Sequence, residues 1–244
     1  MTLNIHKASD IERNNDYSML IYAKAGTGKT SMARYLKGKT LVVDIDRTTH
    51  VLAGAENIDI VNLDTNNPWQ GMVDLINDIE QVLDQYDNVF FDNLSEFENA
   101  WFSEKAHASK SSAPMIQDYN VYTYYLIGMI RRINSWKGVN KIFTAWEKQI
   151  PIQTPTGQSY NQFVPDIREK ILNNVLGLMN VVGRMVYNED SKQRGFILEP
   201  TNSVFAKNQI DNRTSCLAEE LFDFETVRLP NTNSQGNTSE ATES

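Results

Sequence analysis

The chain has 244 residues, a formal net charge of −8 and an isoelectric point near 5.0. Hydrophobic residues make up 41% of it, which excludes a largely disordered chain, and its single cysteine, Cys216, excludes an internal disulfide. The acidic balance excludes a general electrostatic binder of nucleic acid, so any contact with DNA needs a local basic surface.

In chain order, the sequence predicts short buried strands that alternate with helices. The expected strands are 18–22, 41–45, 58–63, 88–92 and 141–145, followed by a C-terminal hairpin of 183–188 and 195–199. The expected helices are 30–36, 66–86, 95–107, 117–136 and 167–179. The polar segment 149–165 is expected to form an extended loop or a small hairpin. This alternation predicts an α/β fold with a mostly parallel central sheet and helices on both faces.

The composition divides the chain into three expected parts. These are an N-terminal segment at 1–17, a folded core at 18–228 and a polar tail at 229–244 that has nothing to bury and is expected to be disordered. No stretch approaches the ~18 apolar residues of a membrane span, and the N-terminus has no signal-peptide core. We therefore expect a cytoplasmic protein with no membrane partner.

The strongest motif is the segment Ala23–Thr30, which follows a predicted strand and precedes a predicted helix. It fits the P-loop pattern of NTP-binding proteins, except that Ala23 replaces the first glycine, which is compatible if that position does not need a positive φ. Lys29 is expected to neutralise the β- and γ-phosphates during catalysis, and Thr30 is expected to bind Mg²⁺. We therefore expect ATP and Mg²⁺ as ligands. The expected nucleotide-binding residues are Ala25, Gly26, Thr27, Gly28, Lys29, Thr30 and Ser31.

Three further strand ends carry candidate chemistry. Asp92 ends an apolar strand and is the expected second Mg²⁺ residue. Hydrolysis also needs a carboxylate to orient the attacking water, and Asp46 and Glu96 are both candidates, although Glu96 also suits a helix N-terminus. Thr144, at the end of the strand 141–145, is a candidate sensor of the γ-phosphate.

The order of these motifs resembles the RecA-like ATPases of bacteriophages, in particular their short single-strand annealing recombinases. The resemblance covers about 15–228 and implies that 18–228 is a RecA-like ATPase core. It implies self-association into a ring or filament with ATP between subunits, action on single-stranded DNA in recombination or replication, and a location in the cytoplasm of an infected bacterium. Because the family's catalytic acid follows the second strand, the resemblance favours Asp46 over Glu96.

The resemblance also assigns residues that act beyond their own subunit. It implies that Lys207 and Arg213 reach the ATP of a neighbouring subunit, although Gln209 stands where the family has an arginine. Trp146 stands where the family has a phosphate-sensing histidine. DNA is expected at two loops, near 103–115 and 149–165. The candidate DNA-binding residues are Lys105 and Lys110 in the first loop, and Tyr160 and Phe163 in the second.

Two alternatives stay open. The first is a helicase loader or partner-switching ATPase that does not bind DNA directly and has a helicase or a single-strand-binding protein as its partner. It is favoured by the weak basic charge of the two loops, by Trp146 and by Gln209. Ala23 and Asp46 permit a nucleotide-binding structural protein that does not hydrolyse ATP.

Overall fold

A computed structural model describes residues 7, 16–153 and 157–224 of the chain. The strands are β1 (Ser18–Ala23), β2 (Thr40–Asp44), β3 (Ile58–Asn62), β4 (Asn88–Asp92), β5 (Asn140–Gln153), β6 (Ser159–Pro165), β7 (Val181–Asn188), β8 (Gln193–Ile197), β9 (Lys207–Asn208) and β10 (Ser215–Leu217). The α-helices are α1 (Pro68–Val82), α2 (Leu94–Ala108), α3 (Ile116–Asn134) and α4 (Glu169–Gly177). The short 3-10 helices are η2 (Thr30–Tyr35), η3 (Thr49–Leu52), η4 (Leu83–Gln85) and η5 (Ala218–Glu220). The predicted tail at 229–244 and most of the segment at 1–17 lie outside the described residues.

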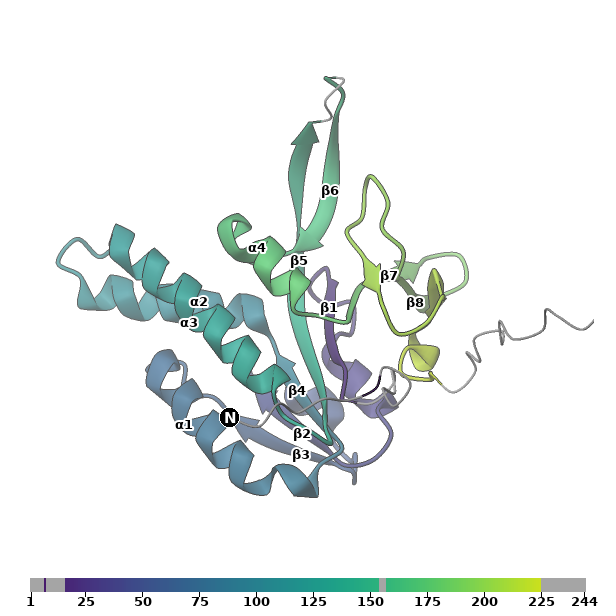
Figure 1. The fold of residues 1–244 in the computed structure, drawn as a ribbon, viewed down its shortest axis with the longest axis horizontal. Helices are drawn as coiled ribbons and strands as arrows, with labels where there is room; N and C mark the ends of the chain where they lie inside the picture. Colours follow the sequence, from purple (N-terminus) through teal and green to yellow (C-terminus); the bar gives the residue numbers. More distant parts are fainter. Residues whose placement is uncertain (1–6, 8–15, 154–156, 225–244) are drawn as a thin grey trace, which may run out of the picture.

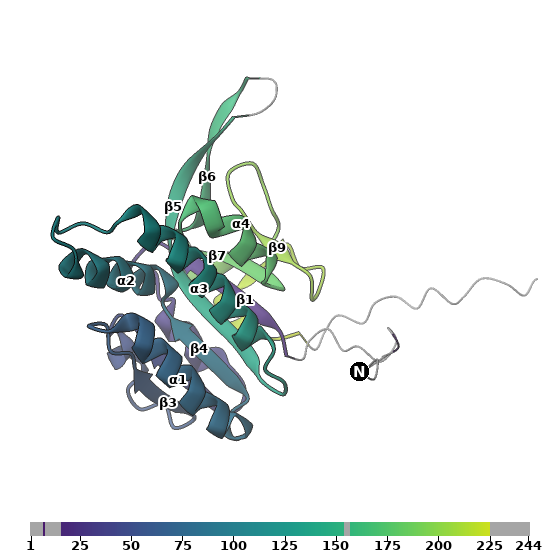
Figure 2. The ribbon, with the colours of Figure 1, turned by 60° about the vertical axis from the view of Figure 1, so that its left-hand side comes forward.

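The strands form one sheet in the order β10-β8-β7-β1-β5-β4-β2-β3 (Figure 1). The run from β7 to β3 is parallel, whereas β8 and β10 are antiparallel additions at one side. β6 pairs with the distal part of β5, and the resulting hairpin projects away from the sheet in Figures 1 and 2. Because β1, β2, β4 and β5 run in one direction, their carboxyl ends meet at one edge, where ligands of such sheets bind.

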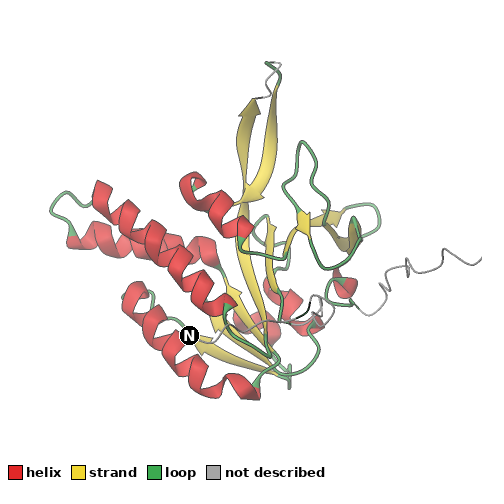
Figure 3. Cartoon of the chain, in the orientation of Figure 1, coloured by secondary structure: helices red, strands yellow, loops and turns green. Residues whose placement is uncertain are grey.

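The two faces of the sheet bury different side chains, as the alternation along β1 shows. Leu20 and Tyr22 pack with the α-helices α1, α2, α3 and α4, which lie on the same face (Figures 2 and 3). Met19 and Ile21 face the opposite side, which is covered by residues of η2, η3 and η5. The expected α/β architecture with a mostly parallel sheet is confirmed, with the long helices on one face and short 3-10 helices on the other.

The segment after the P-loop differs from the expected helix at 30–36. It forms the 3-10 helix η2, in which the Met32 N–H donates to the Lys29 carbonyl at 3.0 Å and the Leu36 N–H donates to the Ala33 carbonyl at 3.3 Å. It ends before Gly38, which has a φ of +80°, in the left-handed region that glycine favours. The segment between the P-loop and Gly38 is too short for a long helix, and short helical segments commonly adopt the tighter 3-10 geometry.

None of the helices within the described residues is long and apolar enough to cross a membrane.

An aromatic cluster joins α1, α2 and α3. The ring of Trp101 is fully buried, stacks on Trp69 with 4.6 Å between centroids, and lies 5.0 Å from the Tyr125 ring. Burial of large rings in such contact contributes both hydrophobic area and favourable ring geometry. This cluster therefore fixes the helices that cover one face of the sheet.

We predict that Trp101→Ala lowers the free energy of unfolding by about 3–5 kcal/mol, because it leaves a large cavity in the cluster. Tyr124→Ala on α3 is the matched control, since Tyr124 is 79% exposed, and it should change stability by less than ~0.5 kcal/mol. Urea denaturation followed by circular dichroism measures both. Equal effects of the two substitutions would contradict the role given to the cluster.

Candidate nucleotide-binding site

The P-loop turns sharply where the sequence supplies glycine. Gly26 has a φ of +78° and Gly28 a φ of +107°, so both adopt backbone conformations that other residues rarely reach. Ala23, which stands in place of the first glycine, is the last residue of β1 and does not have a positive φ. The side chain of Ala23 is therefore compatible with the loop, as the sequence required.

Lys29 is almost completely buried at the base of this loop. Its Nζ donates to the carbonyl oxygens of Ala23 and Lys24, each at 3.3 Å. Burial lowers the pKa of Lys29, and the neighbouring carboxylates of Asp92, Asp46 and Glu147 oppose this shift. An ammonium held by two long hydrogen bonds to neutral oxygens is well placed to exchange them for phosphate oxygens.

A hydrogen-bonded chain of side chains joins the P-loop to two strands. Thr30 Oγ1 donates to Asp92 Oδ2 at 2.5 Å, and Thr144 Oγ1 donates to the other carboxylate oxygen of Asp92. Asp92 is buried at the carboxyl end of β4, and Thr144 is buried in the neighbouring strand β5, near the end of the part that runs parallel to β4 and β1. Burial raises the pKa of Asp92 to about 6, against the effect of its two hydroxyl partners.

The oxygen atoms of this chain fit a magnesium ion. Mg²⁺ prefers hard oxygen ligands and is commonly held by one or two protein oxygens together with phosphates and waters. Thr30 Oγ1 and Asp92 Oδ2 are already adjacent, beside the loop that carries Lys29. These two residues are the ones that would hold the ion, as the sequence predicted.

The two candidate catalytic carboxylates have different surroundings. Asp46 accepts hydrogen bonds from Thr48 Oγ1 and from Asn93 Nδ2, both at 2.6 Å, and the Thr48 hydroxyl lies 3.2 Å from that of Thr30. Glu96 lies in the first turn of α2, where its N–H donates to the N-cap side chain of Asn93 at 2.8 Å. Asp46 is therefore hydrogen-bonded into the Thr30–Asp92 chain, whereas the carboxylate of Glu96 accepts from Asn99, on the same helix.

Three charged residues beside the P-loop were missed by reasoning from sequence. Glu147 follows the parallel part of β5, Arg184 lies in β7 and Arg194 in β8, and all three line a cavity of about 530 Å³ together with the loop residues 24–27. Arg194 Nε donates to the Thr27 carbonyl at 2.6 Å. No local motif marks them, because the pairing of β5 and β7 with β1, and of β8 with β7, brings them to the loop.

The cations expected to act on a neighbouring subunit have partners within the chain. Lys207 Nζ donates to the carbonyls of Leu176 and Gly177, at the C-terminal end of α4. It also donates to the carbonyl of Met179, just beyond that helix, at 2.5 Å. Arg213 Nε donates to Asp211 Oδ2 at 2.7 Å and its other nitrogens donate to backbone carbonyls near η5. These contacts give both residues a structural role, and their action on a neighbouring subunit stays a prediction.

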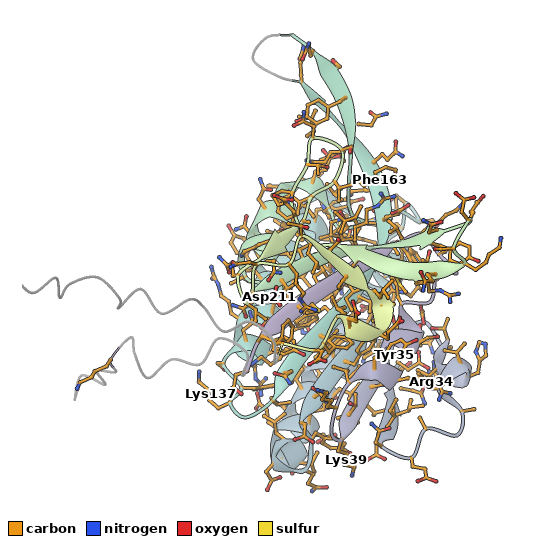
Figure 4. The ribbon with its side chains drawn as sticks, turned by 90° about the vertical axis from the view of Figure 1, so that its right-hand side faces the viewer. Arg34, Tyr35, Lys39, Lys137, Phe163 and Asp211 are labelled. Carbon is orange, nitrogen blue, oxygen red and sulfur yellow. The ribbon has the colours of Figure 1, made fainter. Side chains whose placement is uncertain are left out.

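The two segments expected to bind DNA differ in structure: α2 extends into the first, whereas the second forms the small hairpin that was one of its two expected forms. The expectation that Lys105 lies in a loop is wrong, because α2 continues to Ala108, where its last turn carries Lys105 over the Trp101 ring at 5.2 Å. Lys110 does lie in the exposed turn between α2 and α3. The second region is the β5–β6 hairpin, in which Tyr160 is half-buried and Phe163 packs against the Arg184 guanidinium at 3.5 Å. Figure 4 labels Phe163 on this hairpin, and Tyr35 in η2 after the P-loop.

We predict that Asp92→Asn stabilises the nucleotide-free protein increasingly as pH rises. The folded chain holds the Asp92 proton more tightly than the unfolded chain, since its pKa rises from 3.8 to about 6. The wild type therefore loses unfolding free energy as the pH rises from about 3.8 to about 6. The Asp92→Asn variant has no ionisable group at this position and shows no such loss. The difference in unfolding free energy should grow by ~2 kcal/mol in favour of the variant from pH 4.5 to pH 7.5. Urea denaturation at both pH values checks this, and a pH-independent difference would contradict it.

Comparison with known proteins agrees with this geometry. No curated protein sequence matches the chain. The sequence profile of a family described as "AAA domain" matches residues 15–210, which is most of the chain and includes the P-loop, Asp92, Thr144 and the β7–β8 hairpin. The chain therefore belongs to the AAA domain family, and its core is an AAA-type P-loop ATPase-like domain.

Proposed function

We propose that this chain hydrolyses Mg-ATP and acts on single-stranded DNA in recombination or replication, as a phage protein of the RecA-like type. The observation that carries the ATPase part is the chain of contacts from Thr30 through Asp92 to Thr144 beside the buried Lys29. It joins the P-loop to the end of β4 and to the end of the parallel part of β5, where a γ-phosphate bound by the loop would arrive.

Each residue has a distinct role in this proposal. The backbone N–H groups of 25–31 bind the phosphates, and Lys29 neutralises the β- and γ-phosphates. Thr30 and Asp92 would hold Mg²⁺, which would supply positive charge for the phosphate oxygens. Asp46 orients the attacking water, because its carboxylate is linked to Thr30 through Thr48. Thr144 senses the γ-phosphate, and its hydrogen bond to Asp92 links it to the Mg²⁺ residues.

We predict that Lys29→Ala lowers ATP hydrolysis roughly a hundredfold or more, because it removes the charge that stabilises the transferred phosphate.

Asp46→Asn should lower hydrolysis by ~100-fold or more while nucleotide binding persists, because the variant keeps the nucleotide-binding residues but loses the carboxylate that orients the attacking water. Glu96→Gln is the matched control and should hydrolyse ATP close to the wild-type rate. Phosphate release and binding of a fluorescent ATP analogue measure the two properties.

The result also decides between the candidates for the catalytic acid. A loss in Glu96→Gln with full activity in Asp46→Asn would assign the role to Glu96. Equal background rates in wild type and Lys29→Ala would remove the hydrolysis part of the proposal and leave a nucleotide-binding structural protein.

A second candidate function is an ATPase that acts on a protein partner without binding DNA, such as a helicase loader. One observation favours it: two of the four candidate DNA-binding side chains are already engaged. Lys105 lies over the Trp101 ring and pairs with Glu104 at 3.2 Å, and Phe163 packs against Arg184. Lys110 and Tyr160 then remain as the DNA-binding candidates of the proposal.

We predict that the chain with ATP binds fluorescently labelled single-stranded DNA at low salt, and that Tyr160→Ala weakens binding by about tenfold through loss of base stacking. Fluorescence anisotropy with and without ATP measures this, with Tyr124→Ala as an aromatic control on α3. Absence of binding in both states would overturn the DNA part. Stimulation of ATP hydrolysis by a helicase or a single-strand-binding protein alone would then support the second candidate.

A further inference from the structure

The wall of the cavity opposite the P-loop is supplied by the β7–β8 hairpin. Arg184 from β7 and Arg194 from β8 face the same cavity as the loop residues 24–27, and Glu147 from β5 joins them. Two guanidinium groups thus stand beside the loop that we propose holds the phosphates of ATP. Both belong to the same chain as that loop.

The position of Arg184 is set by the sheet. Its Cα pairs with that of Tyr22 in the parallel β1–β7 ladder, and Tyr22 directly precedes Ala23, where the P-loop begins. A side chain anchored on a central strand is held more rigidly than one on a surface loop. The backbone position of Arg184 relative to the start of the P-loop is therefore set by the register of β7 with β1.

The guanidinium of Arg184 is held at its Nε atom and by packing on a ring. Its Nε donates to Glu147 Oε2 at 2.9 Å, the two side chains are each 15% exposed, and its guanidinium carbon lies 3.5 Å from the centre of the Phe163 ring. Its Nη1 and Nη2 atoms donate no hydrogen bond to any residue that the structure describes. The free edge of a guanidinium matches two phosphate oxygens.

The charge of Glu147 affects how strongly an anion binds in this cavity. A lone carboxylate beside the P-loop would repel the phosphates of ATP, and Glu147 also contributes to the electrostatic environment of Lys29. Its ion pair with Arg184 neutralises that charge. A phosphate bound at the free Nη edge shares this arginine with Glu147, so the carboxylate reduces the positive charge that the arginine offers to the phosphate.

We propose that Arg184 binds the terminal phosphate of the ATP held by its own chain, and that Glu147 restrains this arginine when the terminal phosphate is absent. The proposal rests on the proposed function, because it requires ATP in the P-loop. It differs from the expectation for Lys207 and Arg213, since the cation comes from the same subunit. It also predicts that loss of the Arg184 charge lowers ATP affinity, whereas loss of the Glu147 charge raises it.

The test measures binding of fluorescent ADP and of a non-hydrolysable fluorescent ATP analogue to four proteins. These are wild type, Arg184→Met, Glu147→Gln and the control Arg131→Ala, which removes the same charge from an exposed site on α3. Arg184→Met should weaken the ATP analogue about tenfold or more, the cost of a lost charged hydrogen bond, and leave ADP nearly unchanged. Glu147→Gln should tighten the ATP analogue, and Arg131→Ala should change neither ligand.

Methionine keeps an aliphatic side chain against Phe163, and a thermal melt establishes that the variant is folded. Arg184→Lys keeps the charge without the planar fork and should recover part of the lost affinity. Equal losses for both ligands in Arg184→Met, unchanged affinities, or weaker ATP-analogue binding in Glu147→Gln would each overturn the proposal. Because these readouts do not need turnover, failure of wild type to hydrolyse ATP would refute the ATPase proposal alone.

Discussion

The buried carboxylate of Asp92 is the group on which the site depends, because it joins three separate parts of the chain. Thr30 binds it from the P-loop and Thr144 binds it from β5, while Asp92 itself ends β4. Burial raises its pKa to about 6, so the ionised form is held at a cost in unfolding free energy that the two hydroxyl groups only partly offset. A carboxylate kept in such surroundings is characteristic of a functional site, where a cation compensates the charge on binding.

The parallel order of the sheet explains how these groups meet. β5 lies between β1 and β4, so Thr144 stands between the strand that leads into the P-loop and the strand that ends at Asp92. β2 lies on the other side of β4 and ends at Asp44, which places Asp46 two residues beyond the same edge. Residues separated by more than a hundred positions in the sequence therefore become neighbours because their strands share a direction.

The sequence was sufficient for features that depend on local patterns. Buried apolar runs located β1, β2 and β4, and the glycines at 26 and 28 identified a loop whose backbone needs positive φ. The structure also explains why Ala23 is tolerated, since it belongs to the strand rather than to the turn. These predictions succeed because periodicity and glycine requirements are properties of neighbouring residues.

Features that depend on contacts between distant segments could not be predicted in this way. Arg184 and Glu147 look like ordinary strand residues until the register of β1 with β5 and β7 is known. Lys207 looks like a free cation until its bonds to the end of α4 are seen. The loops expected to bind DNA were placed by the resemblance, and a shared order of motifs does not show whether such a segment is a loop, a hairpin or the last turn of a helix.

The position of Arg184 gives the site a physical link to the projecting hairpin. Its guanidinium packs on Phe163 of β6, and the Phe163 carbonyl accepts a hydrogen bond at 3.0 Å from the hydroxyl of Tyr22 on the strand that enters the P-loop. The ring contact uses the face of the guanidinium and leaves its Nη edge open, so on our proposal one side chain contacts both the hairpin and the terminal phosphate. A partner that changes the position of Phe163 then changes ATP affinity, and reciprocity requires that ATP change the affinity for that partner by the same free energy.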